Sequence, residues 1–175
     1  MIKKYFSLMT LLIVLQCNFQ ACSAANPQKK LIIGSEIGNL APDFALVDID
    51  GKQISLKSLK GKVVYIIFWS YICISCREEL PVAQKKLHEA FPKDVVVLAF
   101  SPRDTKKVLN DFRKKHRITF SMFTNSYGIF EKYGAKVSPY TVIVDKTGVI
   151  RFSKNAALNK DTMKLIEKLI KQKIK

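Results

Sequence analysis

The chain has 175 residues, of which 48% are hydrophobic and 25% charged, a composition that fits one globular domain with or without a leader. Its 30 basic and 14 acidic residues give an unusually high formal net charge of +16. The lysines occur in scattered pairs and the aromatic residues fall in apolar runs, which argues against a nucleic-acid-binding surface. We therefore expect a basic, solvated surface and no nucleic-acid partner.

Residues 1–25 have the pattern of an export signal. Lys3 and Lys4 precede an apolar stretch at 5–15, and small residues follow at 21–25. The apolar stretch is shorter than the about 20 residues that a membrane-spanning helix needs. We expect a cleaved signal peptide and an exported protein, in the periplasm or on the outer face of the inner membrane. An uncleaved anchor is the alternative.

Two cysteines in this segment, Cys17 and Cys22, leave lipidation open. Bacterial lipoproteins carry a lipid on a cysteine that follows a small residue and has Leu or a similar residue three positions before it. Cys22 follows Ala21 but lacks the aliphatic residue, whereas Cys17 has Val14 in that place but no small residue before it. A lipid on either cysteine would attach the protein to the membrane. Cleavage after both would leave two cysteines in the mature chain.

Residues 26–39 are polar and contain glycine, and we expect a linker there before a domain at 40–175. The domain opens with the run at 41–56, where Asp50-Gly51 is a hairpin signal between two short strands.

The middle of the domain alternates buried strands with amphipathic helices. The run "VVYIIFW" is typical of a strand that is covered on both faces, and apolar residues spaced three and four apart predict helices. The expected elements are strands at 63–69 and 94–100, helices at 76–91 and 104–116, a hairpin of strands at 141–145 and 149–152, and a closing helix at 160–173. Because strands that alternate with helices pair in parallel through right-handed crossovers, this order predicts a three-layer α/β/α sandwich with a mixed central sheet and an N-terminal β-hairpin extension.

Cys73 and Cys76 lie where the first buried strand gives way to the first long helix. Free N–H groups and the dipole at a helix start stabilise a thiolate at Cys73 and lower its pKa. Cys76 is one turn further along, close enough to attack a mixed disulfide formed at Cys73. One pair is too few for a disulfide scaffold, and a closed zinc site needs two further ligands. The pattern therefore favours thiol–disulfide exchange.

The strand–CxxC–helix order, followed later by "VSPYT" at 137–141, resembles the thioredoxin superfamily. Over about residues 40–172 the chain is similar to the exported TlpA/ResA-type thiol–disulfide oxidoreductases, which are related to the AhpC/TSA redoxins. The motifs that carry this resemblance are "APDF" at 41–44, "LKSLKGKVVYIIFW" at 56–69, "CREELP" at 76–81 and "YGAKVSPYTVIVDKTGVI" at 133–150. The resemblance implies a thioredoxin-like fold.

The resemblance also implies roles for the residues around the cysteine pair. Cys73 matches the nucleophile and Cys76 the resolving cysteine. Glu79 matches a carboxylate that handles the proton of the resolving cysteine, and partial burial should raise its pKa. We expect the Cys73–Cys76 couple to be the redox group, with no metal, nucleotide or flavin, since no glycine-rich phosphate loop is present.

Further matches concern the substrate side of the site. Pro139 matches a cis-proline that faces the cysteines and leaves the backbone of Ser138 free to pair with an extended substrate. Trp69 matches an aromatic residue ahead of the site and is expected to line its rim. The chain departs from the family in having Ile72 where Trp is usual and Tyr140 where Thr is usual. These departures leave the choice of substrate open.

The resemblance implies that the protein reduces disulfides of substrate proteins in the periplasm, for example the haem-binding cysteines of apocytochrome c. A separate membrane thiol–disulfide electron donor would then regenerate the pair.

Two other functions remain as alternatives. A peroxiredoxin-type peroxidase shares the fold, and Ser70 fits its pattern, but Ile66 stands where such enzymes have proline. A copper-binding module could use the soft thiols, yet His88 and His116 fall on expected helices, and neither is evidently a third ligand.

Overall fold

The computed structural model describes residues 32–173. The export signal expected at 1–25, with Cys17 and Cys22, lies outside these residues. No helix within 32–173 is both long and apolar enough to cross a bilayer.

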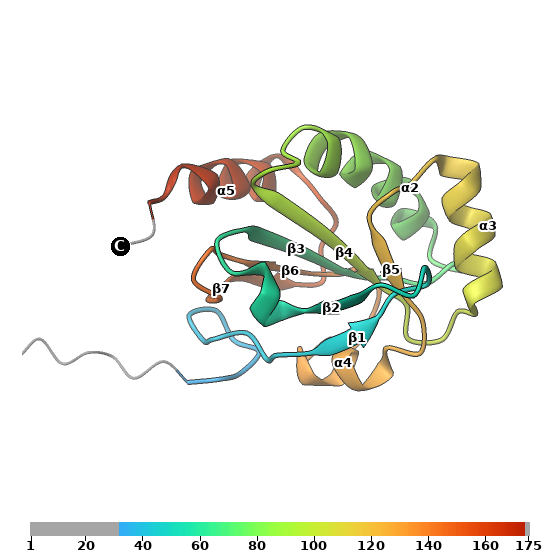
Figure 1. Ribbon diagram of the computed structural model, residues 1–175, viewed down its shortest axis with the longest axis horizontal. Coiled ribbons are helices and arrows are strands. Elements are labelled where there is room, and N and C mark those ends of the chain that lie inside the picture. The colour runs from blue at the N-terminus through green and yellow to red at the C-terminus, as the bar shows by residue number, and fades with distance from the viewer. Residues whose placement is uncertain (1–31, 174–175) are drawn as a thin grey trace, which may run out of the picture. The chain divides into compact units, whose positions relative to one another are not determined.

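A five-stranded mixed sheet forms the centre of the domain (Figure 1). Its strands lie in the order β5 (Ser121–Phe123), β4 (Val95–Phe100), β3 (Val63–Phe68), β6 (Tyr140–Val144) and β7 (Ile150–Lys154). β3 is parallel to β4 and β4 to β5, whereas β6 is antiparallel to both β3 and β7. All six residues of β3 are buried, as its unbroken apolar sequence predicts for a central strand.

Alternate residues along β3 pack in opposite cores, one on each face of the sheet. Tyr65, Ile67 and Trp69 pack in a core with the helices α2 (Ile74–Ala83), α3 (Lys106–His116) and α5 (Lys160–Lys171). Ile66 and Phe68 pack in the opposite core, with the hairpin β1 (Ala45–Val47) and β2 (Gln53–Ser55), the 3₁₀ helix η1 (Leu56–Leu59) and α4 (Tyr127–Lys132). The expected three-layer sandwich with an N-terminal hairpin is confirmed.

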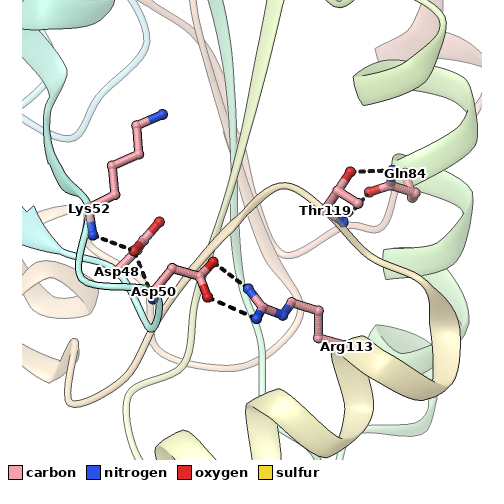
Figure 2. Close-up of polar contacts among 6 residues, drawn as sticks. All are labelled: Asp48, Asp50, Lys52, Gln84, Arg113 and Thr119. Carbon is pink, nitrogen blue, oxygen red and sulfur yellow. Dashed lines mark hydrogen bonds and ion pairs between the residues drawn. The ribbon is translucent and has the colours of Figure 1, made fainter.

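The helix expected at 76–91 consists of two segments. α2 ends at Ala83 and is followed by the π-helical segment η2 (Gln84–Glu89). Pro81 lies inside α2 and has no N–H to donate to the preceding turn. The side chain of Gln84 forms two hydrogen bonds with Thr119, donating from Nε2 to Oγ1 at 2.8 Å and accepting the backbone N–H at 3.0 Å (Figure 2). The change of helix type therefore occurs where the helix is tied to the loop before β5.

Two elements, β5 and α4, were not expected from the sequence. They have three and six residues, too few to show a strand or helix period. Both matter for the site, because α4 and the loops around it lie beside the cysteine pair.

Residues 32–39, which we expected in the linker, are hydrogen-bonded to the start of β7. Gly38 N–H donates to the carbonyl of Ile150 at 2.9 Å, and Leu40 forms isolated bridges with Ile33 and Val149. This part of the segment therefore lies against the domain.

The turn of the β1–β2 hairpin is fastened to α3 (Figure 2). Asp48 Oδ1 accepts the N–H groups of Asp50 and Lys52, each at 2.9 Å, which closes the turn. Arg113 donates to both carboxylate oxygens of Asp50, at 2.5 and 2.8 Å, and this pairing lowers the pKa of Asp50. The Arg113 side chain is only 19% exposed, so this two-bond ion pair is shielded on one side.

We expect Arg113→Ala to lower the free energy of unfolding by about 1 kcal/mol, because it removes both bonds to Asp50. Urea unfolding of the purified protein measures this. Lys107→Ala on the same helix is the control, since Lys107 and Asp111 form an exposed pair that should contribute nothing measurable. Equal losses in the two variants would contradict the proposed anchoring of the hairpin.

Candidate functional site

Cys73 is the N-cap residue of α2, as the sequence predicts. Its backbone is extended, and its Sγ accepts the N–H of Cys76 at 3.2 Å. The sulfur thus takes the place of the capping oxygen that helix starts usually use. Cys73 and Cys76 are joined in a disulfide, with their Cα atoms 5.3 Å apart. Cys73 is half-buried whereas Cys76 is completely buried, so only the first sulfur is open to a large substrate.

The loop that precedes Cys73 is held by Asp104. One carboxylate oxygen, Oδ2, accepts the backbone N–H of Tyr71 at 2.7 Å and the hydroxyl of Ser101 at 2.8 Å. The guanidinium of Arg77 lies 5.4 Å from the centre of the Tyr71 ring. These contacts join the ends of β3 and β4 and fix the approach of the chain to Cys73.

Glu79 lies one helical turn after Cys76, on the same buried side of α2. It is 5% exposed, and its Oε1 accepts the hydroxyl of Tyr65 at 2.5 Å and the N–H of Leu158 at 3.0 Å. Its Oε2 is buried and has no partner among the described residues. Burial raises the pKa of Glu79 to about 7, although both hydrogen bonds oppose that shift. The carboxyl can therefore gain or lose a proton near neutral pH.

Tyr65 was missed from the sequence, although one signal was present. A tyrosine inside an otherwise aliphatic central strand needs a buried partner for its hydroxyl. That partner is Glu79, and Thr141 Oγ1 lies 3.5 Å away on β6. Burial, and then the negative charge of Glu79, raise the pKa of Tyr65 well above its usual value, so it stays a hydrogen-bond donor.

The Ser138–Pro139 peptide bond is cis, as the sequence match implies. The carbonyl of Pro139 accepts the side-chain amide of Asn155 at 2.6 Å. Neither backbone group of Ser138 has a hydrogen-bond partner within residues 32–173. Ser138 and Cys73 line the same groove, which has a volume of about 520 Å³.

The expectation that Trp69 lines the rim of the site is wrong. Its side chain is completely buried and packs on Phe112, with ring centres 5.0 Å apart. The alternation of β3 continues to this residue and directs it into the core beneath α2 and α3. The exposed apolar side chains beside Cys73 are those of Tyr71, Ile72 and Ile74.

Residues 32–173 contain no cluster of three or more His, Cys, Asp or Glu side chains that could hold a metal ion. The ring of His88 packs edge-on against Phe120, and the ring of His116 packs at a tilt against Phe112. Within residues 32–173, a copper ion at the site would have only the thiols of Cys73 and Cys76 as ligands.

Comparison with known proteins places this site in a family. Residues 37–153 match the model of the AhpC/TSA family. The chain belongs to this family. It is 30% identical over 154 residues to the thioredoxin-like protein YneN of Bacillus subtilis, covering 86% of this chain and 89% of that one. It is 32% identical over 116 residues to the thiol–disulfide oxidoreductase ResA of Bacillus thuringiensis, covering 66% of this chain and 67% of that one.

Solved structures agree with the sequence relatives. A candidate protein disulfide isomerase from Bacteroides thetaiotaomicron is 25% identical with a TM-score of 0.71, over 81% of this chain and 96% of that one. The exposed lipoprotein thioredoxin Etrx1 of Streptococcus pneumoniae is also 25% identical, with a TM-score of 0.62 over 73% of this chain and 100% of that one. The protein is thus a TlpA/ResA-like thiol–disulfide oxidoreductase of the thioredoxin superfamily.

The raised pKa of Glu79 has a consequence for stability. Below pH 4.5 the carboxyl is protonated in both states, but between 4.5 and about 7 only the folded chain keeps the proton. The protonated carboxyl therefore contributes fully to the free energy of unfolding at low pH, and this contribution is lost as the pH rises through that range. As the pH rises from 4.5 to 7, we expect the free energy of unfolding of Glu79→Gln to increase by about 3 kcal/mol relative to that of the wild type.

Urea unfolding of the oxidised proteins across this range measures the difference. Glu78→Gln, at the exposed neighbouring residue, is the control and should stay parallel to the wild type. A Glu79→Gln curve that also stays parallel would show that the carboxyl is not perturbed.

Proposed function

We propose that the protein reduces disulfide bonds of substrate proteins outside the cytoplasm, using Cys73 as the nucleophile and Cys76 as the resolving thiol. The observation that carries this proposal is the difference in burial across the pair. An accessible sulfur caps a helix, and its bonded partner is completely shielded by the core. Such a pair can open toward one substrate and close again without exposing the second thiol.

In the first step, the reduced Cys73 thiolate attacks one sulfur of the substrate disulfide. A Cys73–substrate bond forms, the substrate disulfide breaks, and the leaving substrate sulfur takes a proton from water. The N–H of Cys76 stabilises the attacking thiolate, since it already points at Cys73 Sγ. The free backbone of Ser138, which lines the same groove, pairs with the extended substrate segment.

In the second step, Cys76 loses its proton to the Glu79 carboxylate and attacks Cys73 Sγ. The Cys73–Cys76 disulfide forms and the second substrate sulfur leaves as a thiolate. Overall the substrate disulfide gains two electrons, and the protein pair loses them. Tyr65 and Leu158 hold the Glu79 oxygen in place through their hydrogen bonds while the proton moves. The pair is the redox group, and no metal, nucleotide or flavin takes part.

A donor outside this chain must supply two electrons to reopen the disulfide, and we assign this to a membrane thiol–disulfide protein. The haem-binding cysteines of apocytochrome c are the proposed substrate, on the strength of the resemblance to ResA. The signal-like residues 1–25 support export, and lipidation of Cys22 or Cys17 would hold the protein at the membrane. The exposed lipoprotein thioredoxin among the similar structures agrees with such a location.

Cys76→Ala should trap substrates, because the mixed disulfide on Cys73 can no longer be resolved. Expressed in the native envelope, this variant should carry covalent partners that mass spectrometry identifies after removal by a reductant. Cys73→Ala is the control and should capture far fewer. If Cys73→Ala traps and Cys76→Ala does not, the two roles are reversed. Peroxide consumption by the wild type, lost in Cys73→Ser, would instead favour the peroxidase alternative.

Glu79→Gln should slow the resolving step by about 10²-fold, because it removes the base for Cys76. In the wild type this step should accelerate as the pH rises through about 7, where Glu79 ionises, and the variant should lose that inflection. Acid-quench mass spectrometry of the mixed disulfide with a model peptide gives the rate. Glu78→Gln provides a control of the same charge. Equal slowing of both variants would exclude a specific role for Glu79.

A further inference from the structure

The groove beside Cys73 is built from four segments that lie far apart in the sequence. They are the loop before α2, the loop after β4, the helix α4 and the loop before β6. Its volume of about 520 Å³ can hold a short segment of a partner protein.

Part of the groove is apolar and open to solvent. Ile72 is 86% exposed, Val137 54% and Tyr127 46%. Of the ten large apolar side chains exposed on residues 32–173, these three and the neighbouring Tyr71 and Ile74 are grouped around the site. Exposed apolar groups that gather at one place mark a contact surface for another molecule.

Two cations, Arg103 and Lys136, line the same groove. Neither forms an ion pair with a carboxylate within residues 32–173. The Arg103 guanidinium lies 6.0 Å from the centre of the Tyr127 ring, which places its charge over an apolar wall of the groove.

No acidic residue lines this groove. Of the nearby acids, Asp104 already accepts hydrogen bonds from Tyr71 and Ser101. Glu131 lines a neighbouring hollow, which shares Tyr127 and Lys136 with the groove, and it forms no ion pair with Lys136. The groove therefore combines a reactive sulfur, an unpaired backbone at Ser138, apolar walls and uncompensated positive charge.

We propose that the groove selects substrate segments in which acidic residues flank the reactive cysteine. This inference rests on the proposed function and adds the substrate class. The carboxylate of the segment pairs with Arg103 and Lys136, its backbone pairs with Ser138, and its apolar side chains cover Ile72 and Val137. A peptide fits better than another anion, because only a peptide uses the free backbone and the sulfur as well as the charges.

The test compares two peptides, each carrying one cysteine in a disulfide with a neutral 2-thiopyridyl group. One peptide has Glu on both sides of the cysteine and the other has Gln. Reduced protein releases thiopyridone when Cys73 attacks the peptide sulfur, and the absorbance gives the second-order rate constant. We expect the Glu peptide to react about fivefold faster at low salt, with the preference declining as salt is added.

The groove variant, Arg103→Gln with Lys136→Gln, should react with both peptides at similar rates. The control variant, Lys85→Gln with Lys86→Gln, removes the same net charge from exposed sites on η2 and should keep the preference. Equal rates for the two peptides with the wild type would overturn the inference. So would an equal loss of preference in both variants, because the effect would then come from the overall charge.

Two more outcomes are informative. One tests the thiol chemistry itself, and the other tests whether the cations bind lipid instead of a peptide. If neither peptide reacts with the wild type, the proposed function fails and not only its specificity. If the peptides react equally while vesicles containing phosphatidylglycerol bind the wild type and the control variant but not the groove variant, the cations serve a lipid surface and the peptide proposal is overturned.

Discussion

The structure depends on how the chain passes from the central strand β3 into the helix α2. β3 is buried on both faces and ends against the core, and the helix begins within a few residues, with Cys73 as its cap. Helix starts leave N–H groups that need an acceptor, and here that acceptor is the sulfur. The sulfur that completes the helix is therefore also the accessible sulfur of the disulfide, so the helix start and the open side of the pair coincide at one atom.

Cys73 is the most accessible of the four side chains at the site. Cys73 is half-buried, Cys76 and Tyr65 are completely buried, and Glu79 is nearly so. In this dry surrounding a carboxylate is costly unless it is hydrogen-bonded, and the bond from Tyr65 offsets only part of that cost. The result is an acid with a pKa of about 7, one helical turn after Cys76 on the same buried side of α2.

The same sheet also places the loops that surround the sulfur. β3 and β4 are parallel, so their carboxyl ends lie together, and Asp104 ties the two loops that follow them. β6 is antiparallel to β3, and it therefore begins at this edge, which brings Ser138 to the groove. The cysteine pair thus stands on the sheet and the helix, while the groove beside it is formed largely by loops, which are generally the more variable parts of a fold.

The sequence by itself determined the features that follow from residues close together in the chain. These include the buried central strand, the helix start at Cys73, both hairpins and the order of the three layers, because periodicity and turn residues act locally. The short elements β5 and α4 showed no period, and Trp69 was wrongly expected at the rim of the site. The partnership of Tyr65 with Glu79, and the meeting of Arg103 with Lys136, join residues far apart in sequence, and only tertiary packing brings such side chains together.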